Sequence, residues 1–215
     1  MKKDLTELVF IIDRSGSMSG LESDTIGGYN AMLEKQKKEQ GEAVITTVLF
    51  DDKYELLHDR INIRGVEPIT ETDYFVRGST ALLDAVGKTI NKIGRVQKHT
   101  SDSERAERVM VVITTDGMEN ASREFSHEKI RDMITHQKVK YGWEFIFLGA
   151  NIDSAETAES FGIGRDMAAD YNADSEGTRL NYEVISQTVS DIRARRSISK
   201  EWKERIDEDR EKRRS

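Results

Sequence analysis

Two carboxylates follow the two most apolar runs of this sequence. Asp13 ends the run LVFII, and Asp116 ends the run VMVVITT. Both runs are short and rich in β-branched residues, which is typical of strands buried on both faces. A carboxylate that closes such a strand can act as an acid, as a base or as a ligand for a cation. Asp13 and Asp116 are therefore the first candidates for chemistry.

Hydroxyl groups accompany these acids in the loops. Ser15 and Ser17 follow Asp13 in DRSGSM, where the intervening glycine lets the backbone turn tightly. Ser79 and Thr80 end a second loop, where a hydroxyl can cap a helix or project over the sheet edge. Carboxylate and hydroxyl oxygens suit a hard divalent cation, Mg²⁺ first and Mn²⁺ or Ca²⁺ after it. A site with so few protein ligands leaves coordination positions open, and another protein's carboxylate can fill one.

Other reactive side chains offer less. The chain has no cysteine, which excludes disulfides, thiolate metal sites and cysteine nucleophiles. Glu119 follows Asp116 closely, and we expect it either to be solvated or to reach the rim of the metal site. The histidines are dispersed in mostly polar stretches, so we expect surface positions without a ligand role for His58, His99, His127 and His136.

Strand-like and helix-like segments alternate along the chain. A turn at Asp51-Asp52 joins the second and third apolar segments and predicts an antiparallel hairpin. Periodicity predicts strands at 7–12, 43–51, 53–63, 108–116 and 143–151, with a weak edge strand near 165–171. It predicts helices at 21–40, 81–94, 129–138 and 153–163, and a last one with a stripe of Tyr182, Ile185, Val189 and Ile192.

This alternation predicts an α/β fold. We expect a Rossmann-like, doubly wound, mostly parallel sheet with one antiparallel edge strand and helices on both faces. In the common strand order 3-2-1-4-5-6, ligands bind beyond the carboxyl ends of strands one and four. Asp13 and Asp116 end those two strands, so the topology should bring them together.

The length of 215 residues suits one domain with one core. We place that domain at 1–196 and a charged helical tail at 197–215, where only Ile198, Trp202 and Ile206 share an apolar side. Basic residues gather at 193–196 and 211–214, but acids interleave with them in the tail. A charge run of that kind indicates a solvated helix face.

The overall composition excludes several classes. Charged residues make up 34% of the chain, and the formal net charge is -7, which argues against a general nucleic-acid binder. No apolar run approaches the roughly 20 residues that a membrane span needs, and MKKDLTELVF is too short for a signal peptide. We expect a cytoplasmic protein that contacts neither nucleic acid nor membrane.

The segments DRSGSM, GSTALLDAV and TTDG together resemble the von Willebrand factor A domain and its metal-ion-dependent adhesion site. The family pattern is Asp-x-Ser-x-Ser on one loop, a threonine on a second and an aspartate on a third. The matching positions are Asp13, Ser15, Ser17, Thr80 and Asp116. The resemblance implies that the three hydroxyls contact Mg²⁺ and that the two acids hold it directly or through water.

The resemblance implies a bacterial or phage cytosolic adaptor rather than an enzyme, with a metal that accepts an Asp or Glu of a partner protein. Ring-forming ATPases and stress or tellurium-resistance components are the partners that such domains suggest. One alternative is a structural subunit that docks through its C-terminal helix. Another is a metal-dependent phosphohydrolase, although Ser15 stands where the dehalogenase class has its second aspartate.

Overall fold

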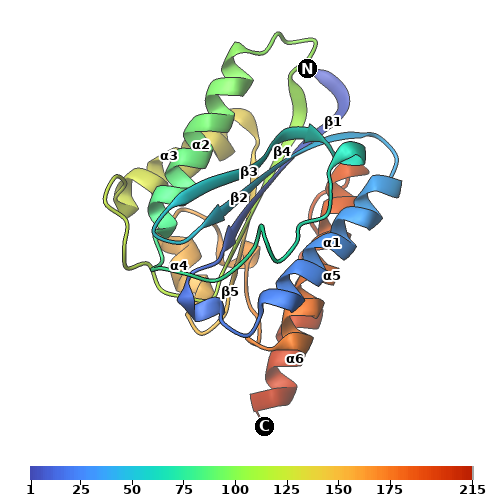
Figure 1. Ribbon diagram of the computed structural model, residues 1–215. Coiled ribbons are helices and arrows are strands. Elements are labelled where there is room, and N and C mark those ends of the chain that lie inside the picture. The colour runs from blue at the N-terminus through green and yellow to red at the C-terminus, as the bar shows by residue number, and fades with distance from the viewer. Residues whose placement is uncertain (215) are drawn as a thin grey trace.

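The computed structural model describes residues 1–214, and within them six strands form one sheet in the order β3-β2-β1-β4-β5-β6 (Figure 1). All neighbours are parallel except β2 and β3, which form the antiparallel hairpin at one edge. The predicted α/β class and strand order are therefore confirmed. The strands are β1 (Lys2–Asp13), β2 (Glu42–Phe50), β3 (Tyr54–Asn62), β4 (Ala106–Thr115), β5 (Glu144–Gly149) and β6 (Ala168–Asp170).

Helices cover both faces of the sheet (Figure 1). One layer contains α1 (Glu22–Lys38), α5 (Ser175–Arg193) and α6 (Glu204–Arg214). The other contains α2 (Leu82–His99), α3 (His127–Tyr141) and α4 (Ser154–Ser160). Three short 3-10 turns complete the secondary structure of the described residues, at Gly16–Met18, Ile63–Gly65 and Arg165–Met167.

The unbroken apolar run of β1 follows from this layering. Successive side chains of a strand point to opposite faces, so a strand covered on both sides needs apolar residues at every position. Leu8 and Phe10 pack in the layer of α1 and α5, whereas Val9 and Ile11 pack in the layer of α2 and α3. Tyr29 of α1 meets the Phe10 ring edge-on, with 5.7 Å between the ring centroids. The central strand is therefore buried from Leu5 up to its last residue, Asp13.

His58 is buried, so the expectation that all four histidines lie at the surface was wrong for this one. Its Nδ1 lies 3.0 Å from the Thr47 hydroxyl, which also hydrogen-bonds the Tyr29 hydroxyl at 2.5 Å. Burial lowers the pKa of His58, because a charged imidazolium is poorly solvated there. His58 thus forms a buried polar cluster with Thr47 of β2 and Tyr29 of α1.

The C-terminal helix α6 packs on the core beside α5 and β6. Ile206 is only 1% exposed and lies in the same apolar cluster as α1 and α5. Just before α6, the Trp202 indole donates a 2.7 Å hydrogen bond to the Asp166 carbonyl. Within α6, Arg213 pairs with Asp174 at 2.5 Å. The domain boundary at residue 196 stays a prediction, but side chains beyond it contribute to this core.

No helix among the described residues has the length and the apolar character that crossing a membrane requires.

We predict that Ile206→Ala destabilises the protein by about 2–4 kcal/mol, because it empties a filled core position. Chemical denaturation of the two proteins measures the difference. Val139→Ala is the matched control, since Val139 is 83% exposed and its truncation should change stability by less than about 0.5 kcal/mol. Equal stability of Ile206→Ala and the wild type would show that α6 does not contribute to the fold.

Candidate metal centre

The five residues of the predicted site lie at the carboxyl end of the sheet. Asp13 is the last residue of β1, and Asp116 directly follows β4. The two strands are paired, with Ile12 opposite Thr114, so both acids leave neighbouring strands at the same edge. Thr80 lies just before α2. The topological argument from sequence therefore placed the two acids correctly.

Three hydroxyl groups converge above this edge. The Ser15 and Ser17 hydroxyl oxygens are 3.1 Å apart, and the Thr80 hydroxyl lies 2.9 Å from that of Ser15. Ser15 and Thr80 are buried, whereas Ser17 is exposed and marks the open side of the site. Residues that are 65 positions apart in the chain thus present adjacent oxygens.

Gly117 brings the third loop against this cluster. A Cβ atom at Gly117 would lie 2.8 Å from the Ser17 hydroxyl and 3.1 Å from the Thr80 hydroxyl. Any side chain would push these oxygens away. The glycine of TTDG therefore allows the Asp116 loop to approach both hydroxyls. A glycine needed only for the turn would not have these oxygens so close to its Cβ position.

Asp13 is fully buried and is held by its own loop, by the end of β4 and by the loop that contains Tyr74. One carboxylate oxygen accepts the Ser15 N–H at 2.7 Å, and the other accepts the Thr115 hydroxyl at 2.5 Å. Its carbonyl accepts the Tyr74 hydroxyl at 2.6 Å. Burial raises the pKa of Asp13 to about 6, even though the hydrogen bonds from Thr115 and Ser15 favour the ionised form.

Asp116 is buried beside it, and its Oδ1 has no hydrogen-bond partner within the described part of the chain. Burial also raises the pKa of this carboxyl, while the Ser17 hydroxyl acts in the opposite direction. A buried carboxylate oxygen without a donor is costly unless a cation or an ordered water contacts it. Together with three neighbouring hydroxyls, this oxygen gives the site the donor set that a hard divalent cation prefers.

Glu119 is half-buried, so it keeps part of the solvent exposure expected for it, and its carboxylate bonds to the start of α2 rather than to the hydroxyl cluster. One carboxylate oxygen accepts the Leu83 N–H at 2.8 Å, and the other accepts the Ala121 and Ser122 N–H groups at 2.9 and 2.8 Å. Glu119 thus caps the start of α2, whose N-cap position Ala81 offers no side-chain oxygen. Because this capping is provided from another loop, the Thr80 hydroxyl is free to face Ser15.

Arg14, the variable residue of the Asp-x-Ser segment, is fully buried and was not singled out from the sequence. Its guanidinium donates to Asp51 at 2.9 Å and to Glu55 at 2.5 Å. Arg77 donates to the same Asp51 oxygen at 2.7 Å, and both guanidinium groups lie about 5 Å from the Phe75 ring. This cluster ties the first loop, the β2–β3 turn and the Thr80 loop together.

Asp51 stays ionised at the centre of this cluster. Burial alone would raise its pKa, but hydrogen bonds from Arg77, from the Lys53 N–H and from Arg14 lower it overall. Arg14 is therefore neutralised by Asp51 and Glu55, although it follows Asp13 directly in the chain.

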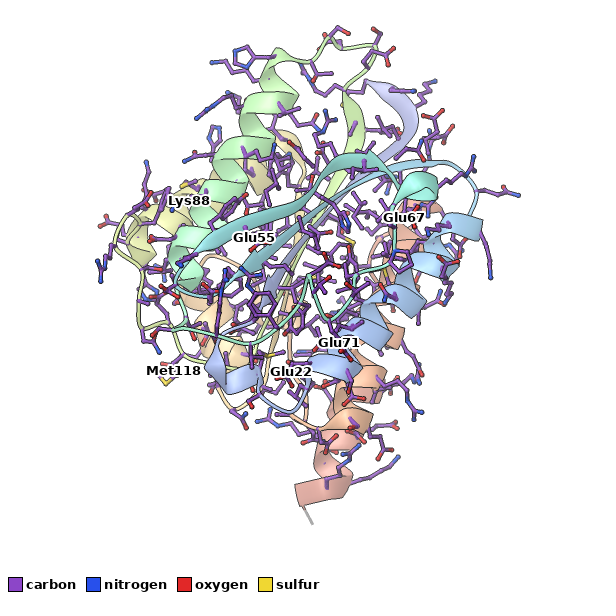
Figure 2. All side chains as sticks on the ribbon, viewed as in Figure 1. Glu22, Glu55, Glu67, Glu71, Lys88 and Met118 are labelled. Carbon is purple, nitrogen blue, oxygen red and sulfur yellow. The ribbon has the colours of Figure 1, made fainter. Side chains whose placement is uncertain are left out.

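Figure 2 shows Glu55 on the face of the β2–β3 hairpin and the exposed Met118 at the end of the molecule where the site loops lie.

No family model and no curated sequence matches the chain. Solved structures do match in fold. They include a mussel byssus proximal thread matrix protein with a zinc-occupied metal-ion-dependent adhesion site, with a TM-score of 0.59 and 13% identity. A von Willebrand factor type A protein from Catenulispora acidiphila has the same TM-score and 11% identity, and manganese-loaded TRAP from Plasmodium vivax has 0.59 and 16%.

These matches cover 86%, 86% and 84% of this chain, but 46%, 42% and 73% of the respective neighbours. The chain thus spans less than half the length of the first two. At such low identities the likeness concerns the fold alone, and on that level it is clear. The protein has the von Willebrand factor A fold.

We predict that Gly117→Ala lowers divalent-metal affinity at least about tenfold while the protein still folds, because the added Cβ displaces two of the three hydroxyl oxygens. Isothermal titration with Mg²⁺ and Mn²⁺ measures the change. Gly27→Ala is the matched control: nothing lies within 4 Å of its Cβ position, and it should bind metal normally. Normal metal binding by Gly117→Ala would contradict this location of the site.

We also predict that Asp13→Asn makes the metal-free protein more stable at pH 7.5, by on the order of 2–3 kcal/mol. The carboxyl has a raised pKa of about 6 against an ordinary 3.8, so its ionised form opposes folding above pH 6. That cost disappears as the pH falls through 6 towards 3.8. Melting curves in a chelator should therefore show a gain for Asp13→Asn that shrinks between pH 7.5 and pH 4. A gain that is constant across this range would contradict it.

Proposed function

We propose that the protein is a metal-dependent protein–protein interaction module. The observation that carries this proposal is the group of three hydroxyls beside the buried, unpartnered Oδ1 of Asp116. Asp13, Ser15, Ser17, Thr80 and Asp116 would hold Mg²⁺, with Mn²⁺ or Ca²⁺ as substitutes. When bound, the cation supplies positive charge and an open coordination position for an Asp or Glu of a partner protein.

The surroundings of the site support a partner contact. Among the five candidate metal ligands, Ser17 is the exposed one. Met118, close to Asp116 in the chain, is 75% exposed. A charged position next to an exposed methionine is a suitable surface for a partner, because methionine adapts to the shape of what it contacts. The neighbours named with zinc and with manganese support metal binding at such a site on this fold.

The same geometry supports binding rather than catalysis. The Ser15 hydroxyl hydrogen-bonds two other hydroxyls rather than a histidine, so it lacks the adjacent base that activates a serine nucleophile. Both oxygens of Asp13 already accept hydrogen bonds. We therefore propose a cytoplasmic adaptor of bacterial or phage type, and ring-forming ATPases or stress and tellurium-resistance components as partners to test first.

Partner capture tests this function. We expect tagged wild-type protein to retain a partner from host lysate in Mg²⁺ and to lose it in a chelator. Asp13→Ala should lose at least about nine-tenths of the captured partner, because it removes one of the two acids of the site. Mass spectrometry of the bound fraction identifies the partner, and purified components then give its affinity.

Ser19→Ala is the matched control, since Ser19 is exposed on the same loop but outside the hydroxyl cluster. It should capture the partner as the wild type does. A partner retained equally by wild type, by Asp13→Ala and in chelator would exclude the metal bridge. If charge reversal on the exposed face of α6, by Arg205→Glu and Glu208→Lys together, then abolished the interaction, the alternative of docking through the C-terminal helix would replace it.

A further inference from the structure

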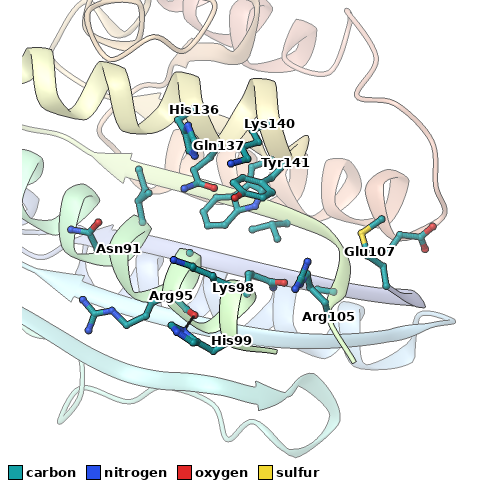
Figure 3. Close-up of a pocket in the computed structure, with 17 residues that line it drawn as sticks. Asn91, Arg95, Lys98, His99, Arg105, Glu107, His136, Gln137, Lys140 and Tyr141 are labelled. Atoms are coloured by element: carbon teal, nitrogen blue, oxygen red, sulfur yellow. Dashed lines mark hydrogen bonds between the residues drawn. The ribbon is translucent and has the colours of Figure 1, made fainter. Parts of the chain in front are cut away.

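A groove of about 840 Å³ lies at the opposite end of the sheet from the metal centre (Figure 3). It is bounded by the last turns of α2 and α3 and by the residues that begin β4 and precede β5. The metal-site acids leave the carboxyl ends of β1 and β4, whereas Ala106 and Trp143 in this groove lie at the amino ends of β4 and β5. The groove is therefore independent of the proposed function.

The floor of the groove is apolar. Ile90 of α2, Val109 of β4 and Trp143 are buried side chains that face it. Tyr141, at the end of α3, is 51% exposed and forms part of the wall (Figure 3). A volume of this size matches that of small-molecule sites, which are typically about 300–1,000 Å³ and lined mainly by apolar and aromatic groups.

The rim of the groove is strongly basic. It is lined by Arg95 and Lys98 of α2, by Arg105 directly before β4, and by Lys140 of α3 (Figure 3). Among the described residues, no carboxylate forms an ion pair with Arg95, Lys98 or Lys140. Arg105 pairs with Asp102 at 3.1 Å, but its buried Nε has no hydrogen-bond partner. The rim therefore carries several positive charges that no carboxylate of residues 1–213 neutralises.

The one acid of the lining does not compensate for them. The Glu107 carboxylate accepts the Asp4 N–H at 3.0 Å and pairs with Arg195 at 2.9 Å, at the outer end of the groove. The C-terminal ends of α2 and α3 add roughly half a negative charge each. Three unpaired side-chain cations against these two helix ends leave about two positive charges, in a chain whose net charge is -7.

We propose that this groove binds a small aromatic anion, with a flat apolar ring on the floor and a phosphate or carboxylate among the rim cations. An apolar floor alone would accept a neutral ring, and a basic surface alone would accept inorganic phosphate. The combination in one groove selects a molecule that carries both parts. A nucleoside monophosphate and a simple aryl phosphate share this chemistry.

Fluorescence of Trp143 tests the proposal directly. The chain has two tryptophans, so Trp202→Phe leaves Trp143 as the only indole, at the groove floor. In this background we expect 1-naphthyl phosphate to change the emission saturably. Inorganic phosphate and 1-naphthol each carry one half of the ligand and should compete at least about tenfold more weakly. Competition by AMP would assign the groove to nucleotides, and its absence would assign it to other aromatic anions.

Charge reversal at the rim gives the second arm. Lys98→Glu and Lys140→Glu should each weaken 1-naphthyl phosphate binding about three- to tenfold, because each replaces an attraction by a repulsion. Lys129→Glu is the matched control, since Lys129 is exposed on α3 outside the groove and should bind within about twofold of the parent. If a charge-reversed protein is poorly folded, Lys98→Gln and Lys140→Gln replace it.

Absence of a saturable signal up to about 10 mM ligand, which is beyond the weakest useful affinity, would overturn the proposal. Equal binding of 1-naphthol would also overturn it, because the basic rim would then have no role. Unchanged affinity in both rim variants would overturn it for the same reason. None of these results bears on metal binding, so the groove and the metal centre are tested separately.

Discussion

The burial of Asp13 is the constraint on which the rest of this structure depends. The central strand β1 ends on a carboxylate that has no exposure to solvent and lies beside a second buried acid, Asp116. The nearest cation in sequence, Arg14, is bound to Asp51 and Glu55 and does not neutralise them. Two acids with pKa values raised by burial therefore remain close together, and their ionised forms oppose folding unless a cation or water contacts them.

Such a site persists only if the surrounding loops are held firmly. Backbone hydrogen bonds provide part of this: the Arg14 N–H donates to the Phe50 carbonyl at 2.8 Å, and the Gly16 N–H to the Gly78 carbonyl at 3.2 Å. The Arg14–Asp51–Arg77 cluster provides the rest and is largely withdrawn from solvent. Removing Asp51 would leave the buried Arg14 with only the half-exposed Glu55 as its partner, and such a loss costs more than the ion pair itself contributes. The ion cluster stabilises the loops that hold Asp116 Oδ1 in its buried position, although no hydrogen bond within the described residues reaches that oxygen.

The sequence predicted the parts of this arrangement that follow from periodicity and topology. The apolar runs and the Asp51-Asp52 turn led to the correct strand order, and that order placed Asp13 and Asp116 at one edge. Contacts between distant loops could not be predicted in this way. Glu119 caps α2 across 36 residues, and Arg14 is buried by partners 37 and 41 positions away. Pattern alone gives a charged loop residue an exposed position, because only the folded structure shows which opposite charges meet it.

Acidic and basic side chains gather at opposite ends of the sheet, and the direction of the helices explains this. At the carboxyl end of the sheet, buried acids lie near the start of α2, whose free N–H groups carry partial positive charge and are capped by Glu119. At the amino end, basic side chains occupy the last turns of α2 and α3, where helix carbonyls carry partial negative charge. The parallel βα topology points every helix of this kind the same way, so it favours acids at one end and bases at the other. At each end of the sheet, some side-chain charge exceeds the partial charge of the helix ends. We infer that this remaining charge attracts a ligand: the acids attract a cation, and the basic groove attracts an anion.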